Sequence, residues 1–125
     1  MRPKTISEVA ERTLSGEPFD LCLKSFLDEF YARPNTQALG TEPRRLCSAL
    51  RDGGVADAYL AAVAESLAAG ASLSTPRWAF AEDRKLERPW FALPFASLRA
   101  LLLWESPPAF RSRNLFVSEN ALSRA

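Results

Sequence analysis

The sequence predicts a mainly α protein, a single compact domain of about five helices with a proline-broken, aromatic-rich C-terminal half. Three observations support this prediction. Apolar residues recur three and four positions apart over most of the first 70 residues, as in amphipathic helices. Helix-starting residues precede these stretches, and glycine or proline follows them. The length of 125 residues is typical of one domain, so we expect residues 1–125 to form a single helical domain.

The first helix is predicted from a capping box at residues 5–8. In this motif the Thr5 hydroxyl accepts a hydrogen bond from the Glu8 amide, and the Glu8 carboxylate accepts one from the Thr5 amide. The expected inward face consists of Ile6, Val9, Ala10 and Thr13. The helix should end at Ser15-Gly16, because glycine readily adopts the left-handed conformation of a helix end.

The second helix has the clearest pattern in the chain. Its apolar stripe consists of Phe19, Cys22, Leu23, Phe26, Leu27 and Phe30. These positions lie on one face of a helix with 3.6 residues per turn. Pro18 suits the first turn, and Pro34 ends the helix because its ring removes a backbone donor and restricts the preceding residue.

The region after Pro34 predicts a polar loop over Asn35–Gly40 and then a short helix. Thr41 is the expected cap of this helix, with Pro43 in its first turn. The residues expected to face inward are Leu46, Cys47 and Leu50. Gly53-Gly54 should close the helix.

A fourth helix is predicted with Asp57 as its cap. Its apolar stripe consists of Leu60, Val63, Ala64 and Leu67. Many alanines raise the helix propensity and allow a neighbour to approach closely. We expect this helix to pack against the second one.

The C-terminal half, from Ser74 onwards, is divided by prolines and holds 8 of the 13 aromatic residues. Phe95–Glu105 is predicted to be a helix whose inward residues are Leu98, Leu101 and Leu102. Leu103 and Trp104 extend its apolar surface, which predicts a central position with contacts on two sides.

The chain after this helix is expected to be irregular, because Pro107-Pro108 forbids its continuation. Asn114–Val117 is predicted to be extended. Ser118 then suits the cap of a last short helix over Glu119–Arg124.

Charge and hydropathy argue against two classes of partner. The sequence holds 16 Lys and Arg against 15 Asp and Glu, whereas a nucleic-acid-binding module usually shows a clear basic excess. The longest apolar run is Ala58–Ala64, far shorter than the roughly 18 residues of a membrane span. Arg2 and Lys4 are followed by polar residues rather than by the apolar core of a signal peptide. We therefore expect a cytoplasmic protein without a membrane partner.

The two cysteines, Cys22 and Cys47, lie in apolar helical patterns. In such a setting cysteine behaves as a small buried hydrophobe. We therefore expect two free thiols rather than a disulfide, as in a reducing compartment.

Several catalytic chemistries lack the residues that they need. The sequence has no histidine, which excludes Ser-His-Asp and Cys-His arrangements, and two thiols 25 residues apart do not form a structural zinc site. No phosphate-binding glycine motif is present. The carboxylate pairs Asp28-Glu29 and Glu82-Asp83 remain, but adjacent helical residues do not face each other. We expect no enzyme, no cofactor and no metal site.

Arginine and aromatic residues alternate in two segments, Arg88–Phe91 and Phe110–Phe116. Three interpretations stay open: core packing with arginine stems over the rings, a protein interface, or a surface that stacks on bases and pairs with phosphates. The candidate partner-binding residues are Trp90, Phe91, Arg111, Arg113 and Asn114. The aromatic side chains would serve as anchors and the arginines as donors to carboxylates of the partner. The alternative function is a nucleic-acid-binding regulator that uses Arg99, Arg111, Arg113 and Arg124.

Four further features, taken together, carry a resemblance. They are Gly16–Asp20 leading to Phe26–Tyr31, Asp57–Glu65, Arg88–Phe91 and Glu105–Val117. With them the chain resembles a family of small uncharacterised bacterial proteins associated with genes for nucleotidyltransferase-like proteins. The resemblance implies the antitoxin-like or accessory member of a two-gene module, and it carries over no catalytic or binding residue. The chain lacks the separate DNA-binding head that many antitoxins carry.

From these observations we expect a non-catalytic protein-binding module. Its partner would be another protein, nucleotidyltransferase-like according to the resemblance, and a homo-oligomer stays open. Which of the C-terminal arginine and aromatic residues face solvent is a question for the tertiary structure.

Overall fold

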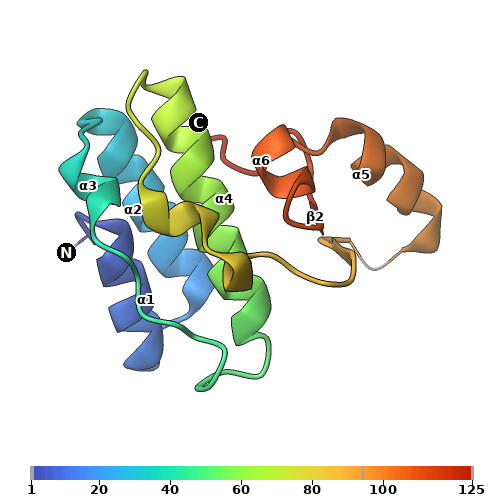
Figure 1. Cartoon of the computed structure of the whole chain (residues 1–125), viewed down its shortest axis with the longest axis horizontal. Helices are drawn as coiled ribbons and strands as arrows, with labels where there is room; N and C mark the ends of the chain where they lie inside the picture. The colour runs from blue at the N-terminus through green and yellow to red at the C-terminus, as the bar shows by residue number, and fades with distance from the viewer. Residues whose placement is uncertain (1, 94, 125) are drawn as a thin grey trace.

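Helices form most of the molecule, as the computed structural model shows for residues 2–93 and 95–124 (Figure 1). The N-terminal part contains α1 (Ile6–Leu14), α2 (Phe19–Ala32), α3 (Gln37–Gly40) and α4 (Gly53–Gly70). The C-terminal part contains three 3-10 turns, two short helices and two short strands. They are η1 (Arg77–Phe80), η2 (Glu82–Arg84), β1 (Trp90–Phe91), η3 (Ala96–Leu98), α5 (Arg99–Glu105), α6 (Pro108–Arg111) and β2 (Leu115–Phe116). The fold class is mainly α, as the sequence predicted.

The predicted start of α1 is confirmed in part. The Thr5 hydroxyl accepts from the Glu8 amide at 3.2 Å, and the four residues expected to face inward are buried. The Glu8 carboxylate, however, accepts from the Lys4 amide at 3.3 Å rather than from that of Thr5. Gly16 follows the helix with a φ of 107°, the left-handed conformation expected there.

The apolar stripe of α2 is confirmed, with Phe30 and four other stripe residues buried and Phe19 half-buried. Pro18 stands one position before the first turn, with an extended backbone. The chain leaves the helix at Arg33, just before Pro34.

The predictions for residues 35–52 are wrong. Asn35–Gly40 is not a loop throughout, because the Asn35 side chain accepts from the Ala38 amide at 2.8 Å and starts α3. No helix follows Thr41: residues 41–52 form extended chain and turns. Cys47 and Leu50 are exposed there, and only Leu46 of the predicted inward residues is buried. Cys22 and Cys47 are both free thiols.

A buried carboxylate explains why residues 41–52 are not helical. Asp57 lies inside α4 rather than at its cap, is 1% exposed, and accepts from the amides of Leu46 and Cys47 at 2.7 and 3.1 Å. Gly53 begins α4 instead of closing a preceding helix, and a Cβ there would lie 1.9 Å from the Leu46 carbonyl oxygen. The Asp57 carboxylate therefore satisfies two backbone amides that an isolated helix over these residues would have paired with its own carbonyls.

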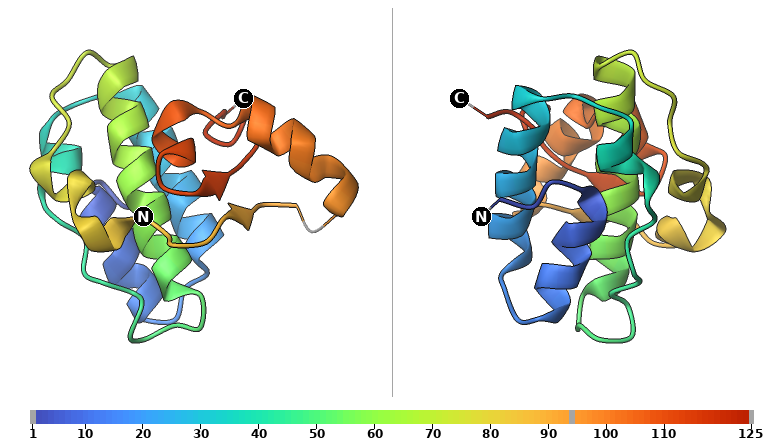
Figure 2. Two further views of the ribbon diagram at one scale, coloured as in Figure 1. Left: turned by 45° about the vertical axis from the view of Figure 1, so that its right-hand side comes forward. Right: turned by 90° about the vertical axis from the view of Figure 1, so that its left-hand side faces the viewer.

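Helix α4 lies between the N-terminal helices and the C-terminal half (Figures 1 and 2). Its predicted stripe is buried together with most of its alanines. The closest backbone neighbours of α4 are α6, η1 and η2. Helix α2 shares the same hydrophobic core and meets α4 through an edge-to-face contact between Phe19 and Tyr59, with ring centroids 6.2 Å apart. None of the helices in the described ranges is long and apolar enough to span a membrane.

The predicted helix at Phe95–Glu105 exists as η3 and α5, but its predicted central position is wrong. Figure 2 shows α5 projecting away from the helical bundle. Leu102 is its one buried residue, whereas Leu101 is half exposed. The apolar residues around α5 therefore form surface rather than core.

The chain end also differs from the prediction. Of the residues predicted to be extended, Leu115 and Phe116 form β2 and pair with β1 in parallel, Trp90 opposite Leu115, whereas Asn114 is in the left-handed region. Glu119–Arg124 forms turns rather than a helix. Tertiary contacts hold this tail: the Tyr31 hydroxyl donates to the Leu122 carbonyl at 2.7 Å, and Arg124 pairs with Asp28 at 2.9 Å.

Candidate functional site

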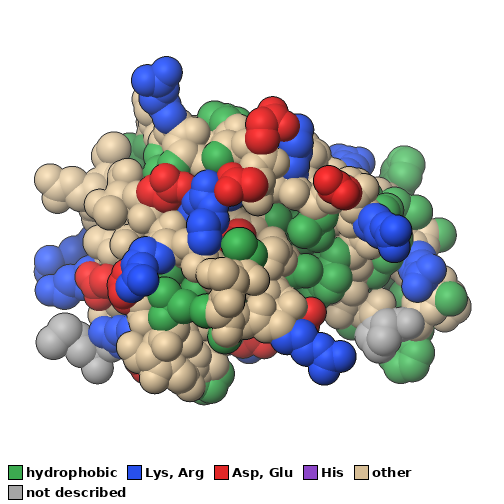
Figure 3. Space-filling view, turned by 60° about the horizontal axis from the view of Figure 1, so that its bottom comes forward, with side chains coloured by type: hydrophobic (Ala, Val, Ile, Leu, Met, Phe, Trp, Pro, Cys, Tyr) green, Lys and Arg blue, Asp and Glu red, His purple; other side chains and the backbone are tan. Residues whose placement is uncertain are grey.

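Large apolar side chains gather on the outside of the α5 region. We define the apolar arm surface by five residues, Leu93, Phe95, Leu101, Leu103 and Trp104. Trp104 is 84% exposed and Phe95 63% exposed. In Figure 3, green side chains gather at the end of the molecule that α5 occupies. Large apolar side chains that are so exposed and lie within 12 residues of one another usually mark a surface that another molecule covers.

The arm is held by the two-stranded pair. The Trp90 amide donates to the Asn114 carbonyl at 2.9 Å, and the Ala92 amide donates to the Phe116 carbonyl at 3.0 Å. The rings of Phe91 and Phe116 stack with centroids 5.2 Å apart. These contacts fix both ends of the segment that carries α5.

Buried contacts fasten α5 itself. Leu102 is buried, and the buried Ser106 hydroxyl donates to the Leu115 carbonyl at 3.0 Å and accepts from the Val117 amide at 3.3 Å. Two charged residues flank the exposed face. The guanidinium of Arg99 lies over the Phe91 ring, 5.1 Å from its centroid, and Glu105 accepts from the Glu119 amide at 3.4 Å.

Two of the five predicted partner-binding residues are aromatic and half-buried. Phe91 stacks on Phe116, and Trp90 lines a hollow beside α4. Arg111, a third, is exposed at the end of α6. These three residues lie within reach of solvent, and none belongs to the apolar arm surface.

Arg113 does not fit the predicted role as a donor to a partner, because it is 5% exposed and its donors are used inside the chain. It donates to Glu65 at 2.6 Å, and to the carbonyls of Ala109 and Ala79 at 2.7 Å each. It thereby joins α4, α6 and η1. Core structure is the interpretation that the geometry favours for this arginine.

Asn114 also has a structural role. Its φ of 63° places it in the left-handed region, which asparagine tolerates better than most residues. Its side-chain amide donates to the Leu86 carbonyl at 2.7 Å. This residue therefore shapes the turn before β2 instead of facing a partner.

The four C-terminal arginines of the nucleic-acid hypothesis have different environments. Arg113 is buried, Arg124 pairs with Asp28, and Arg99 lies over an aromatic ring. Arg111 is exposed. The geometry gives this alternative function no specific support.

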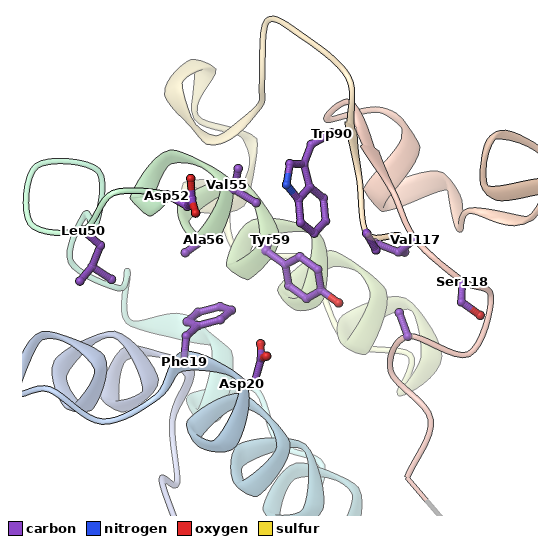
Figure 4. Close-up of a pocket in the computed structure, with 12 residues that line it drawn as sticks. Phe19, Asp20, Leu50, Asp52, Val55, Ala56, Tyr59, Trp90, Val117 and Ser118 are labelled. Atoms are coloured by element: carbon purple, nitrogen blue, oxygen red, sulfur yellow. The ribbon is translucent and has the colours of Figure 1, made fainter. Parts of the chain in front are cut away.

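A hollow of about 490 Å³ lies beside Trp90 (Figure 4). Phe19 from α2, Tyr59 from α4 and Trp90 from β1 line it. Two carboxylates, Asp20 and Asp52, also line it, together with Ser118 and aliphatic side chains. It is an aromatic-lined site that the sequence pattern did not reveal, because its residues come from four distant segments.

The electrostatic environment of this hollow is acidic. Neither Asp20 nor Asp52 forms an ion pair within the described residues. Burial, with a smaller contribution from the Asp20 carboxylate, raises the pKa of Tyr59 to about 12. The Tyr59 hydroxyl is therefore neutral at physiological pH and adds no third negative charge.

The carboxylates considered for acid–base chemistry are paired with basic side chains, Glu29 with Arg2 and Glu82 with Lys85. Asp28 pairs with Arg124, and Asp83 forms a two-bond contact with Arg45 at 2.8 and 2.9 Å. Hydrogen bonding to Arg45 lowers the pKa of Asp83. No group of three or more His, Cys, Asp or Glu residues within residues 2–93 and 95–124 is arranged to hold a metal ion.

Arg84 is a second buried arginine, which the sequence patterns did not reveal. It is fully buried, lies over Trp78 at 4.8 Å, and donates to the carbonyls of Asp57 and Pro43. Burial lowers its pKa. The sequence around it, Glu82–Lys85, resembles an ordinary charged surface segment, so no local signal distinguishes it.

No protein-family model, curated protein or solved structure matches this chain.

Proposed function

We propose that this chain is a non-catalytic protein-binding module whose partner protein covers the apolar arm surface. The observation that carries this proposal is the exposure of Leu93, Phe95, Leu101, Leu103 and Trp104 on one projecting segment. Large exposed apolar side chains that lie close together mark protein interaction sites. Burying such a surface is favourable, and a partner protein that covers it would remove it from water.

The composition of this surface is that of an interface centre. Tryptophan and other large aromatic residues dominate the binding energy of many protein interfaces. Trp104 and Phe95 share one segment with three exposed leucines, and Arg99 and Glu105 on the same segment supply charges of both signs. A stable interface needs about 800 Å² from each partner, so the partner would also cover residues around the apolar arm surface.

The proposed partner is a nucleotidyltransferase-like protein, and the proposed setting is the bacterial cytoplasm. The family resemblance supports both parts of this proposal. In such a pair this chain would be the antitoxin-like or accessory member, and it would act by contact alone. The surface charge of the partner should include an acidic and a basic group placed to meet Arg99 and Glu105.

Co-purification with the products of the genes that flank its own gene tests the proposal. Wild-type chain and two variants, Leu103→Ser and Leu21→Ser, are compared at equal concentration. Leu103 lies on the arm, whereas Leu21 is similarly exposed but lies on α2. We expect a stoichiometric complex that Leu103→Ser weakens at least fivefold, since losing a leucine contact in a well-packed interface costs about 1 kcal/mol or more, and that Leu21→Ser preserves.

Analytical ultracentrifugation of the isolated chain distinguishes self-association from binding to another protein. A second copy on the arm would give a dimer that Leu103→Ser dissociates. A chain that stays monomeric, recovered at every salt concentration with nothing stoichiometric beside it, would contradict the proposal.

A further inference from the structure

We propose that the hollow beside Trp90 binds an organic cation, an alkylammonium group held between three aromatic rings and balanced by two carboxylates. This inference concerns a different surface from the apolar arm and does not depend on the protein partner. Cations are attracted to the negative faces of aromatic rings, and aromatic cages are a common way to recognise quaternary ammonium groups.

The three rings approach the hollow from separate elements. Phe19 and Tyr59 meet edge to face, with an interplanar angle of 89° and centroids 6.2 Å apart. Trp90 lies across the space from Phe19, as Figure 4 shows. Rings in different orientations can surround one guest from several sides, which suits a rounded group better than a flat one.

The cage is held in place before any ligand arrives. Tyr59 packs on the buried Phe110 ring with centroids 5.0 Å apart, in the middle of α4. The backbone amide of Trp90 is held by its hydrogen bond to the Asn114 carbonyl. Phe19 belongs to the first turn of α2. Preorganised side chains reduce the entropy that binding would otherwise cost.

Charge decides the class of ligand. Among the described residues that line the hollow, two are acidic and none is lysine or arginine. Within residues 2–93 and 95–124, Asp28 and Asp83 form ion pairs with arginines, whereas Asp20 and Asp52 form none. This arrangement repels anions and attracts a positive charge.

The size and lining of the hollow match a cation with an apolar body. Its volume of about 490 Å³ falls within the range of small-molecule sites and exceeds what a metal ion needs. Leu50, Val55 and Val117 contribute aliphatic wall. A charged nitrogen surrounded by methyl or methylene groups satisfies both the apolar and the acidic parts of this lining.

Titration calorimetry with choline tests the inference. Its neutral carbon analogue, 3,3-dimethylbutan-1-ol, has the same shape without the charge and serves as the control ligand. We expect choline to bind at least fivefold more tightly than the alcohol, and its affinity to fall as salt rises. Equal affinity for choline and the alcohol would overturn the proposal.

The ammonium group could belong to a free compound or to a lysine side chain of a protein. A second titration therefore uses Nα-acetyl-lysine methylamide. Tighter binding of choline would assign the hollow to free ammonium compounds, and tighter binding of the lysine derivative would assign it to a protein side chain. Failure of both ligands would refute the site itself.

Two charge-matched variants identify the residues responsible. Asp20→Asn removes a carboxylate at the hollow, and Glu87→Gln removes one from an exposed residue elsewhere. We expect Asp20→Asn to weaken choline binding threefold to fivefold and Glu87→Gln to leave it unchanged. Trp90→Leu should weaken it at least threefold, the lower range of a cation–π contact.

Circular dichroism of each variant shows whether the fold is retained, and Asp20 is exposed, so its replacement leaves the core intact. Equal effects of Asp20→Asn and Glu87→Gln would show that general charge, not the cage, attracts choline. That result would contradict the inference even if choline binds. The outcome is separate from the co-purification experiment, because none of these residues belongs to the apolar arm surface.

Discussion

Replacing Arg113 by alanine tests whether this arginine is structural, as its burial indicates. The guanidinium gives three hydrogen bonds, one to the Glu65 carboxylate and two to the carbonyls of Ala79 and Ala109. Removing one partner of a buried ion pair costs about 3–5 kcal/mol. Glu65 is about one third exposed and regains some hydration, so the lower end of that range, about 3 kcal/mol, is expected.

Urea denaturation followed by circular dichroism measures this loss. With a slope of about 1.5 kcal/mol per molar urea, a loss of about 3 kcal/mol lowers the midpoint by about 2 M. Arg111→Ala is the matched control, since Arg111 is exposed two positions away, and we expect it to change the free energy of unfolding by less than about 0.5 kcal/mol.

A double-mutant cycle with Glu65→Ala isolates the ion pair. Because the two charged groups are 2.6 Å apart, we expect a coupling energy of about 1 kcal/mol or more. A loss below about 1 kcal/mol for Arg113→Ala, together with no coupling, would refute the structural role. Arg113 would then again be a candidate for binding a partner.

Three further predictions follow from local geometry. Gly53→Ala should lower the free energy of unfolding by about 1–3 kcal/mol, because the added Cβ would clash with a backbone carbonyl. Gly54→Ala has open space around the added Cβ and should raise the free energy of unfolding by about 0.5–1 kcal/mol. Thermal denaturation compares the two variants. Thiol labelling of the native chain should modify Cys47 alone, because Cys22 is buried and burial raises the pKa of its thiol; two labelled sites would contradict this. Burial raises the pKa of Tyr59 to about 12, so the unfolded chain loses the hydroxyl proton at a lower pH than the folded chain. The free energy of unfolding should therefore fall as the pH rises from 10 to 12. A Tyr59→Phe variant should show a smaller fall when urea denaturation is repeated over this pH range.

Local patterns predicted the helices whose residues pack along a single face. In α1 the Thr5 cap and four inward residues stand where the sequence placed them. In α2 and α4 the apolar stripes are buried as the 3.6-residue period indicated. These elements are predictable because the information that determines them lies within one or two turns of the chain.

The region between α2 and α4 shows what local patterns could not reveal. Thr41 and Pro43 resemble a helix start, but the amides of Leu46 and Cys47 are satisfied by Asp57 instead. That carboxylate lies ten or more residues further along the chain. The Asp57 carboxylate reaches these amides only because α4 packs beside residues 41–52. The spacing of residues within that segment does not predict this packing.

The candidate sites were predictable only in part. Alternation of arginine and aromatic residues singled out Trp90, which does line the hollow, yet Phe19 was predicted only as part of an apolar stripe and Tyr59 was given no role. Arg113 and Asn114 were selected for the same pattern and proved to have partners inside the chain. Side-chain type alone does not tell a buried arginine from an exposed one.

The sequence by itself determined the helical class, the two long amphipathic helices and the extended segment before Ser118, because periodicity and capping act over short distances. Only the tertiary structure decided which apolar residues became surface. Leu102 faces the core while Trp104 faces solvent, since α5 lies against β2 on one side alone. The burial of each side chain depends on neighbours that are distant in the chain, and these neighbours take their places only when the whole chain folds.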